Sequence, residues 1–144
     1  MLKPTNTNYL FKFSIVTAVY NVAPYLSEAI DSILSQDIGF LESVELILVD
    51  DGSTDASGAI CDEYQHKYPE NIVVIHKPNG GVASARNAGI AVARGRYVNF
   101  MDSDDKLTPD TLSSVYDFLL SMIKRWILFL FLFFTSNKKT NHIA

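Results

Sequence analysis

Apolar residues along the first 120 positions follow two alternating patterns, and this alternation predicts the fold. Runs typical of strands occur four times, and the second of them is almost continuously apolar, as strands buried on both faces are. These predicted strands are Lys12–Tyr20, Val44–Asp50, Asn71–His76 and Arg96–Met101. After each strand, apolar residues recur at the spacing of one helix face, which predicts helices over 24–36, 53–68, 81–95 and 109–120.

Local signals mark where these helices begin and end. Pro24 suits the first turn of the first helix, and Thr54 or Asp55 is expected to cap the second. Gly95 is expected to follow the end of the third helix, and Thr108 to cap the fourth. Strands alternating with helices of this length lie parallel and are joined by right-handed crossovers. The sequence therefore predicts an α/β fold with a doubly wound, mostly parallel sheet.

Length and composition agree with one domain followed by an unusual tail. The chain has 144 residues, of which 48% are hydrophobic and 19% charged. We expect residues 1–120 to form the domain and residues 121–144 to form an apolar and then basic tail. The single Cys61 excludes an intrachain disulfide framework, and the N-terminus lacks the apolar core of a signal peptide. These features predict a cytoplasmic protein.

Charge is unevenly distributed along the chain. All 16 acidic residues lie at or before Asp117, and the basic residues that follow it are Lys124, Arg125, Lys138 and Lys139. The body is therefore acidic and lacks the basic face of a nucleic-acid-binding domain. We expect no nucleic-acid partner.

The residues that follow the predicted strands are acidic, polar or glycine. In a parallel sheet the carboxyl ends of the strands meet at one edge, where ligands bind. The loops at this edge are Tyr20-Asn21, Asp50-Asp51-Gly52-Ser53, Lys77-Pro78-Asn79-Gly80-Gly81 and Asp102-Ser103-Asp104-Asp105. The first of these loops lacks the G-x-G-x-x-G motif of a dinucleotide site. The sequence thus predicts a cleft lined by carboxylates, glycines and amides.

The cluster of Asp102, Asp104 and Asp105 needs a compensating charge. Two carboxylates ~5 Å apart repel by about 3 kcal/mol at an effective dielectric of ~20. Either the cluster is solvated in a turn, with one carboxylate capping the next helix, or it holds a divalent cation that binds an anionic ligand. Under the second alternative a nucleotide lies across the edge, with Asp51 accepting from a base N–H or a ribose hydroxyl. Mg²⁺ or Mn²⁺ then joins the acids to the diphosphate, because both present hard oxygen ligands.

Four segments carry a resemblance to a known family: SIVTAVYNVAPYLSEAIDSILSQ, VELILVDDGSTDAS, NGGVASARNAGIAVARGRYVNFMDSDD and TPDTL. They resemble the nucleotide-binding half of family-2 glycosyltransferases, which are inverting enzymes with a GT-A fold that use nucleotide-diphosphate sugars. The resemblance covers about Phe13 to Leu120. It implies a transferase of cell-surface polysaccharide or glycan synthesis, with a UDP-sugar as donor and a saccharide or lipid-linked acceptor.

The resemblance also implies roles at the end of the first two strands. Asp51 matches the acid that binds the base or ribose in the family, and Ala18 matches a position beside the nucleotide where many members have proline. Tyr20 and Asn21 complete the nucleotide-sugar-binding set on this side. Asp51 could instead merely open a turn with Gly52.

Further roles are implied around the DSDD motif. The resemblance makes Asp104 the direct ligand of Mn²⁺ or Mg²⁺, with Asp102 contacting the sugar or ribose or joining Asp104 at the metal. Arg86 faces the same cleft in family members, towards sugar or phosphate, although a surface helix charge is the alternative. For residues 79–81 we expect a turn and not a phosphate cradle, because glycine occurs more often where a turn needs a positive φ than where the backbone contacts a ligand.

The chain departs from the family in its last part. Family members continue well beyond this length, into a part that holds the acceptor surface and a carboxylate acting as general base. Here no acid follows Asp117, so we expect an inactive fragment without a catalytic base; the alternative is a module that binds donor and metal and transfers nothing. A phosphoacceptor receiver domain is disfavoured, because its acids follow the first and third strands, and those loops are TAVYN and KPNGG.

The tail contains the apolar run WILFLFLFF at 126–134. A membrane-spanning helix needs about 20 apolar residues. Extending the run back to Phe118 would include Lys124 and Arg125, whose charges oppose insertion. We therefore expect an interfacial or aggregation-prone tail that contacts the inner face of a membrane peripherally. The change in composition after about Ile123 also fits an AT-rich coding sequence translated out of frame.

Overall fold

The computed structural model describes residues 8–137, with side chains described through residue 130. Its strands are β1 (Phe11–Val19), β2 (Val44–Asp50), β3 (Ile72–His76) and β4 (Gly95–Phe100). Its helices are α1 (Ala23–Leu34), α2 (Phe40–Ser43), α3 (Ser57–Lys67), α4 (Val82–Val92) and α5 (Thr111–Asn137). Each predicted strand and helix is present, and the short α2 is an element that the apolar pattern did not predict.

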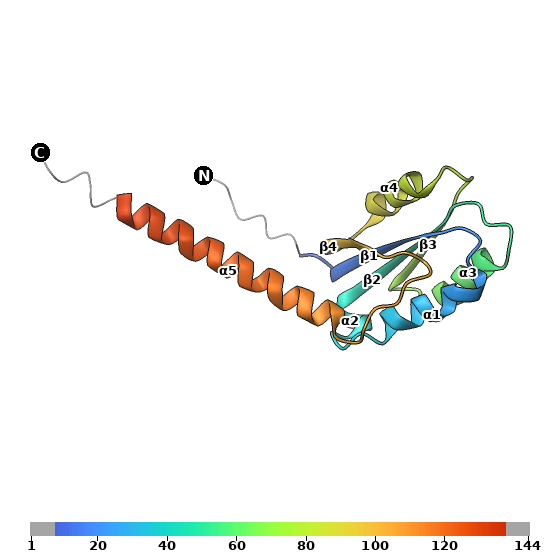
Figure 1. The fold of residues 1–144 in the computed structure, drawn as a ribbon, viewed down its shortest axis with the longest axis horizontal. Helices are drawn as coiled ribbons and strands as arrows, with labels where there is room; N and C mark the ends of the chain where they lie inside the picture. Colours follow the sequence, from blue (N-terminus) through green and yellow to red (C-terminus); the bar gives the residue numbers. More distant parts are fainter. Residues whose placement is uncertain (1–7, 138–144) are drawn as a thin grey trace, which may run out of the picture.

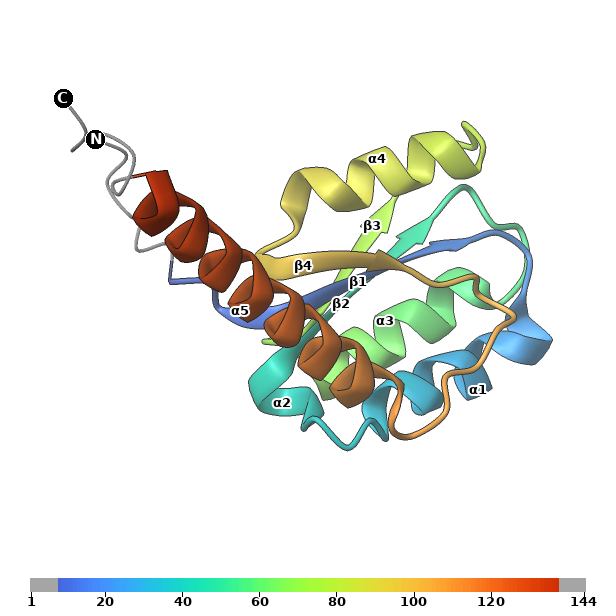
Figure 2. The same ribbon diagram turned by 60° about the vertical axis from the view of Figure 1, so that its left-hand side comes forward.

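The strands form one sheet in the order β3-β2-β1-β4, and every neighbouring pair is parallel. Helix α4 lies on one face of the sheet, and α1 and α3 lie on the other (Figures 1 and 2). The chain moves outward from β1 to β3 and then returns to place β4 on the far side of β1. This reversal confirms the doubly wound α/β fold, and it opens a crevice at the carboxyl ends of β1 and β4.

Side chains alternate along β1 between two cores. Phe13, Ile15 and Val19 belong to the larger core under α1 and α3, whereas Val16 belongs to the smaller core under α4. Helix α4 approaches the sheet closely through Gly89, because a Cβ at that position would lie 2.3 Å from Cγ1 of Val16. The central strand β2 is thus covered on both faces, which explains why it is almost continuously apolar, whereas the edge strand β4 is largely exposed.

The prediction that Gly95 follows directly on the end of the third helix is wrong. Helix α4 ends at Val92, and Gly95 is the first residue of β4. A Cβ there would lie 2.5 Å from the backbone nitrogen of Ser14 on β1. Glycine is therefore needed for the close approach of two strands, not for ending a helix.

Two helices begin later than expected. Helix α3 begins at Ser57, and its cap position, Ala56, provides no side-chain hydrogen bond. Asp55 nevertheless accepts from the N–H of Ser57 at 2.9 Å, so the aspartate stabilises the first turn from one residue further away. Helix α5 begins at Thr111, three residues after the threonine expected to cap it.

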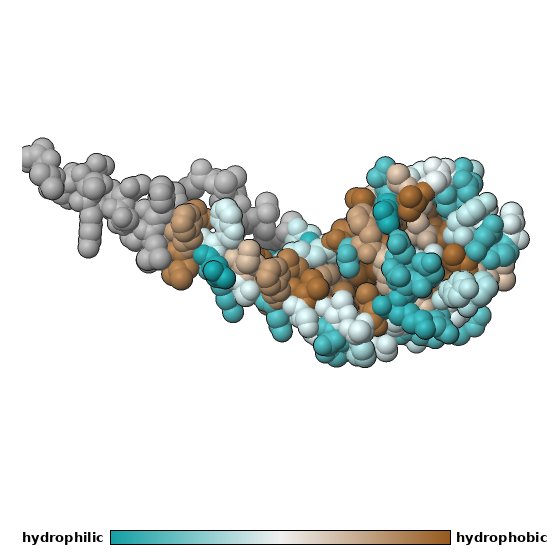
Figure 3. Space-filling view, viewed as in Figure 1, coloured by the Kyte–Doolittle hydropathy of each residue, from teal (hydrophilic) through white to brown (hydrophobic). Residues whose placement is uncertain are grey.

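Helix α5 extends through the expected domain boundary at residues 120 and 121 without a break and projects from the body (Figure 1). Leu112 is buried in the larger core, whereas Trp126 and Ile127 are exposed. Apolar side chains gather along the projecting part (Figure 3). The helix continues because neither glycine nor proline interrupts the segment. Within residues 8–137, no helix combines the length and hydropathy required to cross a membrane.

Candidate functional site

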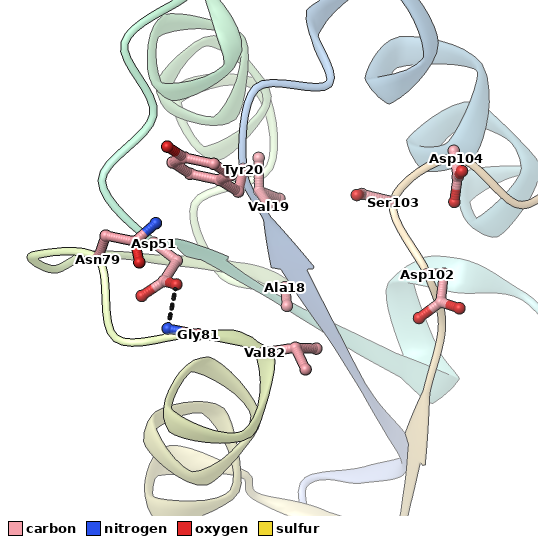
Figure 4. Close-up of a pocket in the computed structure, with 10 residues that line it drawn as sticks. All are labelled: Ala18, Val19, Tyr20, Asp51, Asn79, Gly81, Val82, Asp102, Ser103 and Asp104. Carbon is pink, nitrogen blue, oxygen red and sulfur yellow. Dashed lines mark hydrogen bonds between the residues drawn. The ribbon is translucent and has the colours of Figure 1, made fainter.

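A pocket of about 320 Å³ lies at the carboxyl edge of the sheet (Figure 4). Its lining residues are Ala18, Val19, Tyr20, Asp51, Asn79, Gly81, Val82, Asp102, Ser103 and Asp104. The pocket thus brings together five residues expected from the sequence, and Asn21 and Arg86 are not among those that line it. The acids come from opposite sides, because Asp51 follows β2 while Asp102 and Asp104 follow β4, with β1 between them.

Asp51 is buried in the wall of the pocket and already has three donors. Its Oδ1 accepts from Nζ of Lys77 at 2.7 Å and from the N–H of Gly80 at 2.9 Å. Its Oδ2 accepts from the N–H of Gly81 at 2.8 Å. The hydrogen bond from Lys77 lowers the pKa of Asp51, against the effect of burial and with help from both glycines. The carboxylate is therefore ionised at neutral pH and, with roughly four acceptor positions in all, has room for one more donor.

The loop after β3 is a turn that serves Asp51. The N–H groups of Gly80 and Gly81, which a phosphate cradle would use, are both directed to the Asp51 carboxylate. Gly81 has φ +89°, a conformation that glycine adopts without strain. Asn79 also packs on the preceding loop, because a Cβ at Gly52 would lie 2.8 Å from its backbone nitrogen. These contacts support the turn-forming interpretation of the two glycines.

Tyr20 and Asn21 at the end of β1 have different environments. Tyr20 lines the pocket and is half exposed. Asn21 has φ 49°, and its Oδ1 accepts from the N–H of Thr54 at 2.8 Å. The N–H of Asn21 in turn donates to Oγ of Ser53 at 3.1 Å. Asn21 therefore joins the loops after β1 and β2, and its side chain is not part of the pocket lining.

The opposite wall is the DSDD loop. Asp102 and Asp104 are exposed, whereas Ser103 between them is buried. Oδ1 of Asp102 accepts from Nη2 of Arg86 at 3.0 Å, and the Arg86 guanidinium lies 5.3 Å from the centre of the Phe100 ring. Arg86 thus places a positive charge beside the acids from its position on α4.

Helix α1 and the turn that follows it anchor the segment after the DSDD motif. Nε2 of the buried Gln36 donates to the carbonyl of Thr108 at 2.7 Å, and its Oε1 accepts from the N–H of Leu112 at 2.9 Å. Lys106 also forms an ion pair with Glu28 of α1. No motif in the sequence marks Gln36; its signal is a polar residue at the end of the predicted apolar helix face.

The residues of the DSDD loop fit a divalent cation. Among the residues that the structure describes, no group of three or more His, Cys, Asp and Glu side chains is close enough to enclose a metal ion. A cation such as Mg²⁺ does not require such a group, because it keeps several waters and binds one or two carboxylates together with phosphate oxygens. Among the residues that the structure describes, the Asp104 side chain forms no hydrogen bond or ion pair. The Asp102 carboxylate accepts from Arg86 and has further acceptor positions free. The chemistry of the donor set therefore agrees with Mn²⁺ or Mg²⁺.

The doubly wound parallel sheet, with its acid-lined pocket at the carboxyl edge, has the architecture of the GT-A class of folds. The model of the family "Glycosyl transferase family 2" matches residues 14–122. This chain belongs to that family.

Relatives and solved structures agree with this assignment. The minor teichoic acid biosynthesis protein GgaB of Bacillus subtilis (strain 168) is 50% identical over 111 residues, which make up 77% of this chain and 12% of GgaB. The structure of S. aureus TarS 1–349 in complex with UDP superimposes with a TM-score of 0.70 at 33% identity, covering 77% of this chain and 32% of that one. The mannosyltransferase PcManGT from Pyrobaculum calidifontis, in complex with GDP-Man and Mn²⁺, gives a TM-score of 0.64 at 27% identity over 74% of this chain and 31% of that one. The chain thus spans a third or less of the length of these proteins.

Proposed function

We propose that this chain is the donor-binding part of an inverting glycosyltransferase that moves a sugar from a UDP-sugar to an acceptor hydroxyl in cell-surface polysaccharide synthesis. One observation carries the proposal: a buried, ionised Asp51 and the acidic DSDD loop lie on opposite walls of one pocket. A nucleoside diphosphate has a hydrogen-bonding base at one end and an anionic group at the other, and this pocket has a matching partner for each. The teichoic acid role of GgaB and the UDP bound to TarS support the choice of pathway and donor.

At the nucleoside end, Asp51 is proposed to accept from the base N–H or a ribose hydroxyl. Its three internal donors leave room for one further donor and hold the carboxylate in place. Ala18 and Tyr20 provide the adjoining surface of the pocket, against which a nucleoside can pack. A buried acceptor favours a ligand that donates there, because a ligand lacking the donor would leave the remaining acceptor position of Asp51 unsatisfied.

At the diphosphate end, Asp104 is proposed to hold Mn²⁺ or Mg²⁺, with Asp102 contacting the sugar or sharing the metal. When bound, the metal would neutralise charge on the departing diphosphate. Arg86 is proposed to contribute a second positive charge, since its guanidinium is fixed between Asp102 and the Phe100 ring. These residues bind and orient the leaving group and do not accept the proton of the acceptor.

The acceptor hydroxyl needs a general base on the other side of the anomeric carbon. A positioned base contributes about 10²–10⁴-fold to a rate. No acid follows Asp117 in this sequence, and the DSDD acids lie on the side of the leaving group. We therefore propose that the 144-residue chain by itself binds donor but transfers sugar poorly.

The proposed setting is the cytoplasm at the inner face of the membrane, where α5 contacts lipid. Trp126, Phe129 and the neighbouring Lys124 and Arg125 combine apolar and cationic side chains on the projecting helix, a composition that suits an anionic interface. Sedimentation with anionic vesicles tests this proposal. A chain lacking residues 125–144 should remain in the supernatant, and equal sedimentation of both chains would contradict the proposal.

The transfer proposal is tested by measuring release of nucleoside diphosphate from a panel of nucleotide sugars, with and without mixed saccharide and lipid-linked acceptors. We expect slow, acceptor-independent release from a UDP-sugar, which Asp104→Ala reduces. The matched control is Asp117→Ala, which changes an exposed acid on α5 far from the pocket. Rapid acceptor-dependent turnover would show that the chain already contains a base, and the absence of any effect of Asp104→Ala would refute its role.

A further inference from the structure

His76, the last residue of β3, bridges two carboxylates behind the pocket. Its Nδ1 lies 2.9 Å from Oδ2 of Asp50, and its Nε2 lies 2.8 Å from Oδ1 of Asp62 on α3. Both ring nitrogens therefore face acceptors. Only the doubly protonated imidazolium can donate to both at once, because the neutral ring has a single N–H.

The bridge lies directly beside the predicted nucleotide contacts. Asp50 and His76 are register partners in the sheet, and the residues that follow them, Asp51 and Lys77, form the ion pair in the pocket wall at 2.7 Å. The N–H of Lys77 also donates to the carbonyl of Asp50 at 3.0 Å. A movement of Asp50 and His76 would therefore be transmitted, through one peptide bond on each strand, to Asp51 and Lys77.

The surroundings hold the Asp50 carboxylate firmly. Its Oδ1 accepts from the N–H of Ser53 at 3.0 Å, which closes the turn after β2. A Cβ at Gly58, in the first turn of α3, would lie 2.8 Å from Oδ2 of Asp50 and 3.5 Å from Cε1 of His76. The turn after β2 and helix α3 thus pack against each other, and the His76 imidazole contacts both of them through Asp50 and Asp62.

We propose that His76 is a positioning residue for nucleotide binding, whose bridge between Asp50 and Asp62 fixes the turn that presents Asp51 to the ligand. This inference rests on the proposed nucleotide site. His76 does not line the pocket, so it acts through Asp50 on one side and through Lys77 on the other. Nucleotide affinity should therefore depend on the protonation of a side chain that the nucleotide does not touch.

The expected direction of the pH dependence follows from the groups around the ring. Asp50 of β2 and Asp62 of α3 face His76, and their hydrogen bonds raise its pKa above the ordinary 6.5. Cys61 of α3 adds no charge, because burial raises the pKa of its thiol to about 12. On the pocket side, the Lys77 ammonium is directed to Asp51. The full bridge is present below pH 6.5 and is lost as the pH rises through the raised pKa.

The first test measures UDP affinity by calorimetry in Mn²⁺, from below pH 6.5 to above the raised pKa of His76. Wild-type affinity should fall as His76 loses its proton, by about fivefold, the equivalent of one net hydrogen bond. His76→Ala should bind weakly at every pH, and His76→Asn, whose amide can still donate to Asp50, should lie between the two without the wild-type step. His66→Ala is the matched control, because His66 is an exposed histidine of α3, the helix that carries Asp62, and this variant should follow the wild-type profile.

The second test needs no ligand. In NMR titrations the backbone amides of Asp51, Gly80 and Gly81 should shift with the same midpoint as the His76 ring. Amides that remain unchanged while His76 titrates would overturn the positioning role, as would a His76→Ala variant with wild-type affinity and pH profile. If the wild-type chain binds no UDP at any pH while the amides do follow His76, the coupling stands but the nucleotide site, and the role that rests on it, is refuted.

Discussion

At the scale of single residues, the pocket is organised around the buried carboxylate of Asp51, which the loop after β3 holds with three hydrogen bonds. Asp51, Asp102 and Asp104 could be assigned to one edge because parallel strands present their carboxyl ends together. The contacts of Asp51 with Lys77, Gly80 and Gly81 depend on how the loop after β3 folds back, which no periodicity encodes. The same holds for Asn21, whose side chain is directed to the next loop instead of the pocket.

Replacing Asp51 tests its proposed contact with the nucleoside independently of metal. Asp51→Ala should weaken uridine binding in EDTA by about tenfold or more, because a hydrogen bond to a charged group contributes about 1.5–3 kcal/mol. Calorimetry or ligand-observed NMR measures this affinity, and a thermal melt checks that the variant remains folded. Asp117→Ala serves as the control. Unchanged affinity for uridine would leave Asp51 with a purely structural role in its turn.

At the scale of secondary structure, the strands and helices of the body followed from apolar spacing, whereas their ends depended on tertiary contacts. Gly95 shows this, because the need for glycine arises from the approach of β4 to β1. Helix α5 shows the opposite case, in which the apolar run itself prolongs a helix that was expected to end near residue 120. Short α2 has too few residues to display a helical period.

The joint between α4 and β4 depends on a buried acid. Glu45 of β2 is fully buried and accepts from the Nε and the backbone N–H of Arg94, at 2.6 and 2.8 Å, and from the hydroxyl of Ser14. Arg94→Met should lower the free energy of unfolding by about 2–3 kcal/mol, because the carboxylate stays buried without its cation. Urea unfolding measures this change. Arg96→Met, which alters an exposed arginine on the next strand, should cost much less, and equal losses would contradict the role of the buried pair.

At the scale of the whole molecule, the chain has an acidic body with a packed core, and a helix with exposed apolar side chains projects from it (Figure 3). The fold class and the family could be established from the sequence because the motifs occur in the order that a doubly wound sheet requires. The direction of α5 could not, since the apolar run alone does not say what it packs against. The pocket lies within the body, so donor binding should not depend on the exposed part of α5.

Calorimetry of UDP binding, with Mn²⁺ and with EDTA, tests the central claim that this pocket binds a nucleoside diphosphate through a metal. The acidic DSDD loop repels a diphosphate unless a cation lies between them, so UDP should bind at least about tenfold more tightly in Mn²⁺. Asp104→Ala should abolish this difference and leave the affinity in EDTA nearly unchanged. Equal affinity of the wild-type chain in Mn²⁺ and EDTA, or a metal effect that survives Asp104→Ala, would contradict the account.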